Sequence, residues 1–218
     1  MGYILRLLPS LLSGAATALV LFFVVLLCSI PLGFLFTLCL RSRVGAVRAA
    51  ANVYVYIFRS TPLMLQLIII YFGLPYLPVV GEFLKLERFS AAILGFILNY
   101  AAYFAEIFRG GLLGVDRGQY EAAQVLGLTK TQTTVRIIIP QMVRIALPSV
   151  GNEIITLLKD TSLLYAVSVP EIIKNAQIAV NRDANFTALG LALVIYMALN
   201  FVLTVVIKKL EGLMKWGE

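Results

Sequence analysis

The chain has 218 residues, of which 61% are hydrophobic and only 13% charged, and its mean hydropathy is +0.94. Soluble domains carry roughly 25% charged residues, so the composition argues against a soluble globular protein. One helical span across a ~30 Å hydrocarbon core uses ~20 residues, so five or six spans would account for the whole length. We therefore expect an all-α membrane protein without a separate soluble domain.

The net charge is +7, and the sequence contains no histidine and no Gly-Lys dipeptide. The basic residues lie in the breaks between apolar runs rather than in a stripe with aromatic residues, which argues against nucleic-acid binding. The missing histidine excludes Cys/His zinc sites and Ser-His-Asp triads, and the missing Gly-Lys excludes a Walker A phosphate loop. A disulfide between Cys28 and Cys39 is not expected, because eleven helical residues separate them by roughly 16 Å.

Hydropathy and charge divide the chain into five predicted spans with short connections. Pro31 is expected to kink or end the first span, and the second carries Arg59 and Pro62. The fourth is interrupted by prolines and by charged residues. The predicted spans cover residues 11–40, 53–77, 89–108, 137–166 and 186–207.

The positions of the basic residues predict the orientation of these spans. Twelve Lys and Arg residues lie in the stretches 41–59 and 109–144 and at the C-terminus, and six lie in the remaining connections. An excess of basic residues marks cytoplasmic loops, so we expect the N-terminus outside and the C-terminus in the cytoplasm. The same rule places Glu82 outside and Lys215 inside.

The polar stretch 116–136 between the third and fourth spans has strong helix signals. Asp116 is a good N-cap, Gly127 is a typical helix stop, and Thr129 with Gln132 forms a capping box for a following helix. We therefore expect a short cytoplasmic helix with a small, smooth surface.

Two polar stripes run along the third and fourth spans. Spacings of three, four and seven residues place the members of each stripe on one helix face. Ionised carboxylates in hydrocarbon are costly, so these faces must meet protein or water, either as interhelical hydrogen bonds or as a substrate site. The stripes consist of Asn99, Tyr103 and Glu106 in the third span, and of Ser149, Glu153, Thr156 and Asp160, bordered by Asn152, in the fourth.

Glu153 is the carboxylate for which we favour the substrate site. It lies deep in its span and has no basic residue three or four positions away in either direction. Arg59 and Arg144 are expected toward the cytoplasmic ends of their spans, away from it. A cationic amino acid such as arginine, whose guanidinium can bind a carboxylate bidentately, would then be its partner.

The stretch 116–140 resembles the EAA loop of bacterial ABC importer permeases. The match comprises Glu121, Ala122, Ala123 and Gly127 at the family spacing from residues 137–140, with Ile139 as a mild departure from the usual Leu. The resemblance implies that these four residues form a coupling helix that docks into a groove of an ATPase subunit.

Flanking segments resemble the histidine/glutamine/arginine uptake family of polar amino acid permeases, which are transmembrane subunits of type I ABC importers. These segments are residues 58–63 with Gln66, residues 103–119, and residues 152–163. The resemblance implies two ATP-binding subunits that carry ATP and Mg, a second permease that is identical or homologous, and an external amino-acid-binding protein. No cofactor or metal is expected on this chain. The expected substrate-binding residues are Glu153, Asn152, Asn99, Tyr103, Gln66, Thr156 and Asp160.

Two other functions are compatible with parts of the pattern. An ion-coupled secondary amino acid transporter could use Glu153 and Asp160, but it would not require the EAA spacing. An intramembrane enzyme is disfavoured, because the sequence has neither Gly-x-Ser-x-Gly nor Gly-x-Gly-Asp. Dependence of uptake on a separate ATPase, rather than on a proton gradient, separates the first alternative from an ABC importer.

Overall fold

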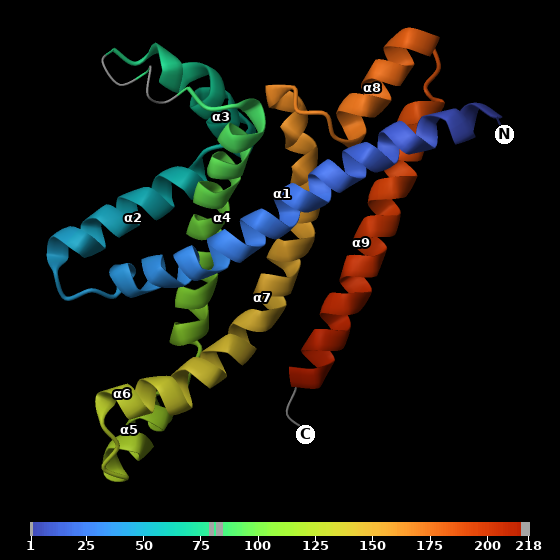
Figure 1. Ribbon diagram of the computed structural model, residues 1–218. Coiled ribbons are helices and arrows are strands. Elements are labelled where there is room, and N and C mark those ends of the chain that lie inside the picture. The colour runs from blue at the N-terminus through green and yellow to red at the C-terminus, as the bar shows by residue number, and fades with distance from the viewer. Residues whose placement is uncertain (1, 79–80, 82–84, 215–218) are drawn as a thin grey trace.

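The computed structural model describes residues 2–78, 81 and 85–214, and every regular element in that part of the chain is helical (Figure 1). Glu82 and Lys215, whose sides of the membrane were predicted, lie outside the described residues. The helices are α1 (Gly2–Leu40), α2 (Gly45–Ser60), α3 (Leu63–Ile68), α4 (Arg88–Leu113), α5 (Arg117–Val125), α6 (Lys130–Thr133), α7 (Ile139–Asp160), α8 (Ile172–Asp183) and α9 (Thr187–Met214).

Three of these helices, α1, α4 and α9, are long and apolar enough to cross a membrane, and the bent pair of α2 with residues 63–76 is a fourth candidate. α7 is not among these candidates, and it carries Arg144, Glu153, Lys159 and Asp160. The all-α class is therefore confirmed. The arrangement with five spans remains a prediction, and α7 is the polar span in it.

α1 runs obliquely across the bundle and packs most extensively on α4 (Figure 1). Of the two alternatives expected at Pro31, a kink or an end, the end is excluded, because the helix continues to Leu40, where the predicted span also ends. At Gly33 the two backbones meet so closely that a Cβ atom would lie 2.6 Å from Phe104 Cβ. Thr37 reinforces the contact, because its hydroxyl lies 2.9 Å from the carbonyl oxygen of Ala105 on α4.

The second predicted span, 53–77, is not one continuous helix. α2 ends at Ser60, Thr61 is extended, and Pro62 precedes α3, with a bend of 105° between the two helical segments. Proline disfavours the helical conformation of the residue before it, which explains why the break falls at Thr61. After α3, a π-helical turn (Ile69–Gly73) and a 3-10 turn (Leu74–Tyr76) complete the segment.

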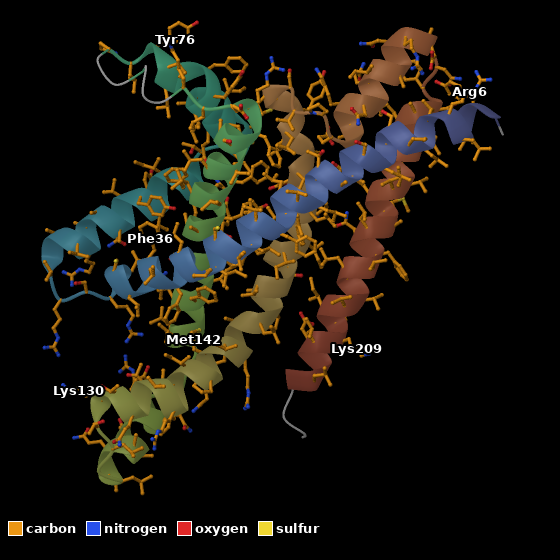
Figure 2. All side chains as sticks on the ribbon, in the orientation of Figure 1. Arg6, Phe36, Tyr76, Lys130, Met142 and Lys209 are labelled. Atoms are coloured by element: carbon orange, nitrogen blue, oxygen red, sulfur yellow. The ribbon has the colours of Figure 1, made fainter. Side chains whose placement is uncertain are left out.

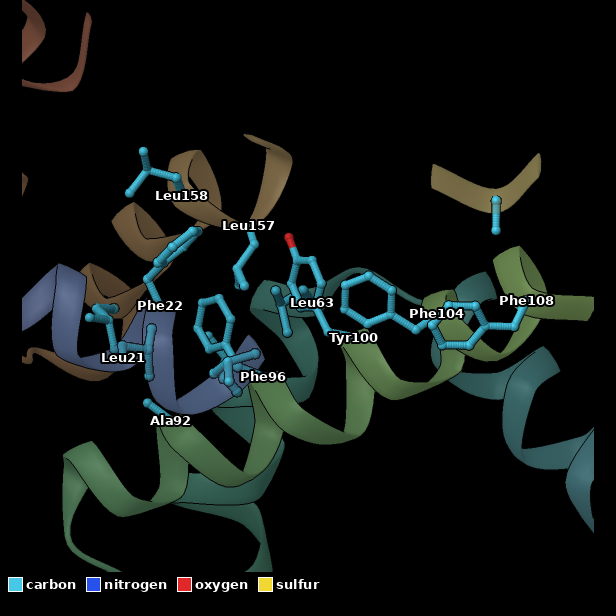
Figure 3. Close-up of a cluster of buried hydrophobic side chains, with 14 of the residues drawn as sticks. Leu21, Phe22, Leu63, Ala92, Phe96, Tyr100, Phe104, Phe108, Leu157 and Leu158 are labelled. Atoms are coloured by element: carbon cyan, nitrogen blue, oxygen red, sulfur yellow. The ribbon is translucent and has the colours of Figure 1, made fainter. Parts of the chain in front are cut away.

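An aromatic stripe on α4 forms the centre of the main hydrophobic core (Figure 3). Phe96, Tyr100, Phe104 and Phe108 recur every fourth residue, and their neighbouring ring centroids lie 6.1–6.4 Å apart. The spacing of four places all of them on one helix face, where they meet apolar side chains of α1, α3 and α7. This packing fixes α4 as the central helix of the bundle.

The fourth predicted span, 137–166, comprises three kinds of helix in sequence. A π-helical turn (Thr134–Ile138) leads into α7, and a 3-10 segment (Thr161–Val167) follows it. Pro140 lies in the first turn of α7, directly after the π-helical turn, and Pro148 lies inside α7 without ending it. The polar stripe on α7 therefore lies within one continuous helix.

α8 connects α1 with α9 through Glu171, a fully buried carboxylate. Glu171 is the N-cap of α8, since its side chain accepts hydrogen bonds from the backbone N–H groups of Ile173 and Lys174, and the hydroxyl of Tyr196 on α9 donates to it at 3.0 Å. Gly14 of α1 packs directly on the Glu171 backbone, where a Cβ would lie 2.6 Å from the carbonyl carbon.

The far end of α8 is also tied to α1. The hydroxyl of Tyr3 donates to Asp183 at 2.9 Å, and the Arg182 guanidinium donates to both oxygens of the same carboxylate. The hydrogen bonds from Arg182 lower the pKa of Asp183 to about 2, with a smaller contribution from Tyr3. The N-terminal part of α1 is therefore held at both ends of α8.

Candidate functional site: a polar cavity and an exposed helix

A cavity of about 650 Å³ lies between α2, α4 and α7. Its walls combine charged and polar side chains with small residues, and both predicted polar stripes contribute to it. Gly111 lets α4 approach α7 closely beside the cavity, because a Cβ there would lie 3.0 Å from Ala146 Cβ. The lining consists of Arg59 from α2, of Tyr103, Glu106, Ile107, Gly110 and Gly111 from α4, and of Ile145, Ala146, Ser149, Asn152 and Glu153 from α7.

Arg59 lines the same cavity as Glu153, so the expectation that it lies away from that carboxylate was wrong. The cause is the break at Thr61, which ends α2 beside α4 and leaves Arg59 in the last turn of α2, facing the bundle. Its guanidinium carbon lies 5.4 Å from the centroid of the Tyr103 ring, within the range of a cation–π contact.

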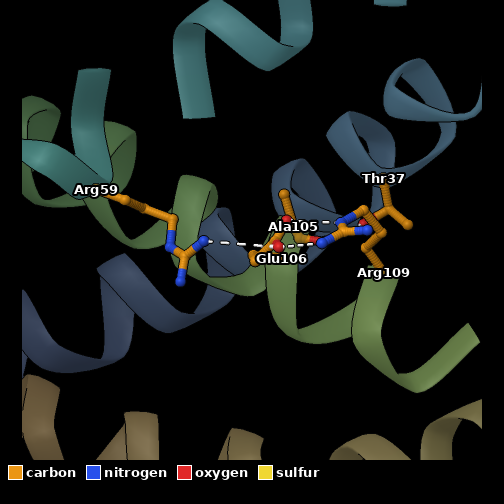
Figure 4. Close-up of polar contacts among 5 residues, drawn as sticks. All are labelled: Thr37, Arg59, Ala105, Glu106 and Arg109. Carbon is orange, nitrogen blue, oxygen red and sulfur yellow. Dashed lines mark hydrogen bonds and ion pairs between the residues drawn. The ribbon is translucent and has the colours of Figure 1, made fainter. Parts of the chain in front are cut away.

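Glu106 lies between two arginines (Figure 4). Arg109 Nε donates to Glu106 Oε2 at 2.8 Å, and Arg109 Nη2 donates to the other carboxylate oxygen. Arg59 Nη1 lies 3.7 Å from that same oxygen, Oε1. Glu106 is therefore paired with two cations, and the three groups together carry one excess positive charge.

Glu153 and Asn152 lie on the α7 side of the cavity. Glu153 is half-buried, and the basic residues nearest to it along its own helix, Arg144 and Lys159, are nine and six positions away. A carboxylate on one wall and the Arg59 guanidinium on another give the cavity charges of both signs. Such a cavity offers a counter-charge to each of the two charged groups of an amino acid zwitterion.

Gln66 and Asn99 do not line this cavity. Both side chains are buried, with exposed fractions of 8% and 4%. Gln66 Nε2 donates to the carbonyl oxygens of Phe58 and Thr61 and to the Thr61 hydroxyl, at 2.7–3.1 Å. Asn99 Nδ2 donates to the Phe58 carbonyl at 3.1 Å and to Gln66 Oε1 at 2.9 Å. The two amides therefore satisfy the backbone groups that the break between α2 and α3 leaves unpaired.

Thr156 and Asp160 continue the α7 stripe beyond the cavity. Thr156 donates to the carbonyl oxygen of Asn152 in its own helix at 3.0 Å. The Tyr100 hydroxyl donates to Asp160 Oδ2 at 2.7 Å, so the polar end of the aromatic stripe on α4 meets this carboxylate. Of the seven side chains expected at a substrate site, the structure gathers Tyr103, Asn152 and Glu153 around the cavity and leaves the other four outside its lining.

The second candidate site is the short helix α5, whose caps were predicted correctly. Asp116 accepts a hydrogen bond from the Gly118 N–H at 2.7 Å, and Gly127 has a φ of +70°. Thr129 and Gln132 form the capping box for α6. Glycine suits the left-handed conformation at position 127, which ends α5 and turns the chain toward α6.

The exposed face of α5 differs from the predicted one. Ala123 is only 1% exposed, so it packs against the rest of the chain rather than contributing to a free surface, whereas Glu121 and Ala122 are exposed. Val125 and Leu126, which sequence reasoning missed, are 87% and 75% exposed. Two large apolar side chains exposed at the end of a polar helix are typical of a protein contact surface. The sequence did contain a signal for this surface, because Val125 and Leu126 are adjacent apolar residues in a polar stretch.

The model of the binding-protein-dependent transport system inner membrane component family matches residues 29–216, which include both sites. This chain belongs to that family. The match covers the cavity helices α4 and α7 and the helix α5 together, so the EAA resemblance and the amino acid permease resemblance apply to one domain. Family members are permease subunits of transporters, and this chain is a multi-pass membrane component of the same kind.

Individual relatives in the family are named for different amino acids. The probable amino-acid ABC transporter permease protein YckA of Bacillus subtilis is 36% identical over 192 residues, which cover 88% of this chain and 83% of that protein. The putative glutamine transport system permease protein GlnP of Rickettsia conorii is 35% identical, covering 82% and 83%. The arginine transport system permease protein ArtQ of Bacillus subtilis is 34% identical, covering 96% and 94%.

A solved structure supports the fold across nearly the whole chain. The crystal structure of an amino acid ABC transporter with histidines matches with a TM-score of 0.88 and 28% sequence identity, and the match covers 96% of each chain. The type I ABC importer permease fold predicted from the sequence is therefore confirmed, and the chain is an amino acid ABC transporter permease.

Proposed function

We propose that this permease carries a cationic amino acid, such as arginine, through the cavity between α2, α4 and α7. The observation that carries this proposal is the pair of opposite charges on the cavity walls, with Glu153 on α7 and Arg59 on α2. A half-buried carboxylate in a membrane protein needs a compensating positive charge or a proton, and Arg59, the cation in the lining, forms its ion pair with Glu106 rather than with Glu153 within the described residues. A transported ammonium or guanidinium group supplies that charge while it occupies the cavity.

Arg59 gives the cavity a second anchor, for the α-carboxylate of the substrate. The Arg59, Glu106 and Arg109 group has one positive charge in excess, because one carboxylate meets two guanidinium groups. A carboxylate entering beside Arg59 would offset that excess, and a guanidinium can bind it bidentately. Tyr103, whose ring lies under the Arg59 guanidinium, keeps that side chain positioned over the cavity wall.

Transport is coupled to ATP hydrolysis on partner subunits through α5. In this proposal the exposed residues Glu121, Ala122, Val125 and Leu126 contact an ATP-binding subunit, and Gly127 sets the turn that presents them. The complete transporter then contains two ATP-binding subunits with ATP and Mg, a second permease and an external amino-acid-binding protein. Ala123 lies on the buried side of α5, which contacts the π-helical turn (Thr134–Ile138) that leads into α7.

The membrane orientation in this proposal places α5, α6 and the end of α9 in the cytoplasm and the N-terminus outside. Lys130 and Lys209 lie toward the lower end of the view in Figure 2, and Arg6 and Tyr76 lie toward the upper end. Lys130 and Lys209, which the charge bias assigns to the inside, therefore lie toward one end of the molecule. Arg6, which it assigns to the outside, lies toward the other end.

The test is uptake of radiolabelled arginine by the assembled transporter with Glu153→Gln. Loss of the charge at constant size should reduce arginine uptake at least tenfold, which corresponds to about 1.4 kcal/mol. Glu211→Gln is the matched control, because Glu211 is also half-buried but lies on α9 outside the cavity lining. Arginine transport by Glu153→Gln at the parent rate would exclude this role for Glu153.

A further inference from the structure

A second cavity, of about 530 Å³, lies on the other side of the Arg59 and Glu106 pair. The two cavities share these two side chains, but the second one opens between the end of α1, one face of α2 and the last turns of α4. Its lining consists of Leu40 from α1, of Arg48, Asn52, Val55, Tyr56, Arg59 and Ser60 from α2, and of Glu106 and Arg109 from α4.

The second cavity is strongly basic. Three guanidinium groups, those of Arg48, Arg59 and Arg109, meet one carboxylate, that of Glu106. That carboxylate is already bound by Arg109 and approached by Arg59. Arg48 reaches the Ser42 carbonyl oxygen at 3.4 Å, and it forms no ion pair with a carboxylate within the described part of the chain. The cavity therefore has two positive charges in excess, which an anion would offset.

Basic residues and an exposed apolar helix face adjoin this cavity. The turn between α1 and α2 places the basic residues Arg41 and Arg43 beside the start of α2. Farther along the same helix, Val53, Tyr56 and Ile57 are exposed, with exposed fractions of 57%, 72% and 49%. A basic pocket next to an exposed apolar helix face suits a ligand that is anionic at one end and apolar at the other.

We propose that this second cavity binds the phosphate group of an anionic phospholipid from the leaflet that borders the turn between α1 and α2. The phosphate lies between Arg48 on one side and Arg59 and Arg109 on the other, and the three guanidinium groups donate charge-assisted hydrogen bonds to its oxygens. The acyl chains lie along the exposed apolar side of α2, against Val53 and Ile57. Because Arg59 and Glu106 also line the substrate cavity, the bound lipid stabilises one wall of the transport path.

The experiment uses the assembled transporter in detergent, with phosphatidylglycerol as the probe and phosphatidylcholine as the zwitterionic comparison. Native mass spectrometry at increasing lipid concentration measures how much of each lipid is retained. Arg48→Gln should weaken phosphatidylglycerol binding at least roughly fivefold, because it removes one charge-assisted contact. Arg43→Gln is the matched control, with the same change of charge five residues earlier and outside the cavity, and it should leave binding within about twofold of the parent.

Each outcome decides the proposal. Selective loss in Arg48→Gln, with an unchanged mass of the assembled complex, supports it. Equal retention by the parent and Arg48→Gln, or equal losses in Arg48→Gln and Arg43→Gln, overturns it, since binding then does not use this cavity. Displacement of phosphatidylglycerol by inorganic phosphate at similar concentration also overturns it, because the site would then take a soluble anion. Arginine uptake does not enter any of these readouts, so the result is independent of the proposed substrate.

Discussion

Asn99 on α4 donates a hydrogen bond to Gln66 on α3 at 2.9 Å, and this contact joins α4 to α3 beside the break between α2 and α3. Both amides also bond backbone oxygens at the end of α2. The two amides therefore hold together the two halves of a bent candidate span. Such breaks are tolerated only where neighbouring groups satisfy the freed backbone atoms.

Asn99→Ala should destabilise the fold without changing substrate affinity. The substitution removes the only amide N–H that Gln66 Oε1 accepts within the described contacts, and losing such a buried partner costs about 1–3 kcal/mol. We expect a lower thermal denaturation temperature of the purified complex and an unchanged KM for arginine. Asn152→Ala provides the contrast, because Asn152 lines the cavity. This substitution should raise the KM for arginine and leave the denaturation temperature nearly unchanged. A raised KM in Asn99→Ala at unchanged stability would restore Asn99 to the substrate site.

The local features of the chain were predictable from sequence because their causes are local. Asp116, Gly127 and the pair Thr129 and Gln132 specify the caps around α5 through side chains within a few residues of the backbone groups that they satisfy. The same holds for the apolar runs that became α1, α4 and α9, since hydropathy alone defines them.

Features that depend on packing between distant segments were not predictable in this way. Pro62 signalled a disturbance, but the 105° bend and the resulting place of Arg59 depend on how α2 packs against α4. The burial of Ala123 depends in the same way on which face of α5 turns toward the segment that leads into α7. A polar stripe on a helix likewise predicts that its members avoid lipid, but it does not distinguish a residue that lines a cavity, such as Asn152, from one that is buried in hydrogen bonds between helices, such as Asn99.

The exposed apolar end of α5 should be needed for binding the ATPase subunit. Leu126→Ser removes a side chain that is 75% exposed, and burial of a leucine contributes roughly 1.5–3 kcal/mol. We therefore expect about tenfold weaker association with the ATP-binding subunit in co-purification at decreasing protein concentration. Leu113→Ser is the matched control, because Leu113 is 68% exposed but ends α4, before α5 begins. Equal co-purification of the two variants would argue against docking through this surface.

The orientation can be measured with single cysteines in a background where Cys28 and Cys39 are replaced by serine. Lys85→Cys lies before α4 and is expected outside, whereas Lys130→Cys begins α6 and is expected in the cytoplasm. An impermeant maleimide should label the first variant in intact cells and the second only after the membrane is opened. The reverse labelling pattern would contradict the orientation and, with it, the cytoplasmic position of α5.

The central claim is that the charge of Glu153 selects a cationic substrate, and citrulline tests it most directly because it matches arginine in shape but has no charge on its side chain. The measurement is the ratio of arginine to citrulline uptake by the reconstituted transporter, with and without Glu153→Gln, at saturating ATP. We expect the parent to prefer arginine at least about tenfold and Glu153→Gln to lose that preference. Equal uptake of both compounds by the parent, or an unchanged preference in Glu153→Gln, would contradict the claim.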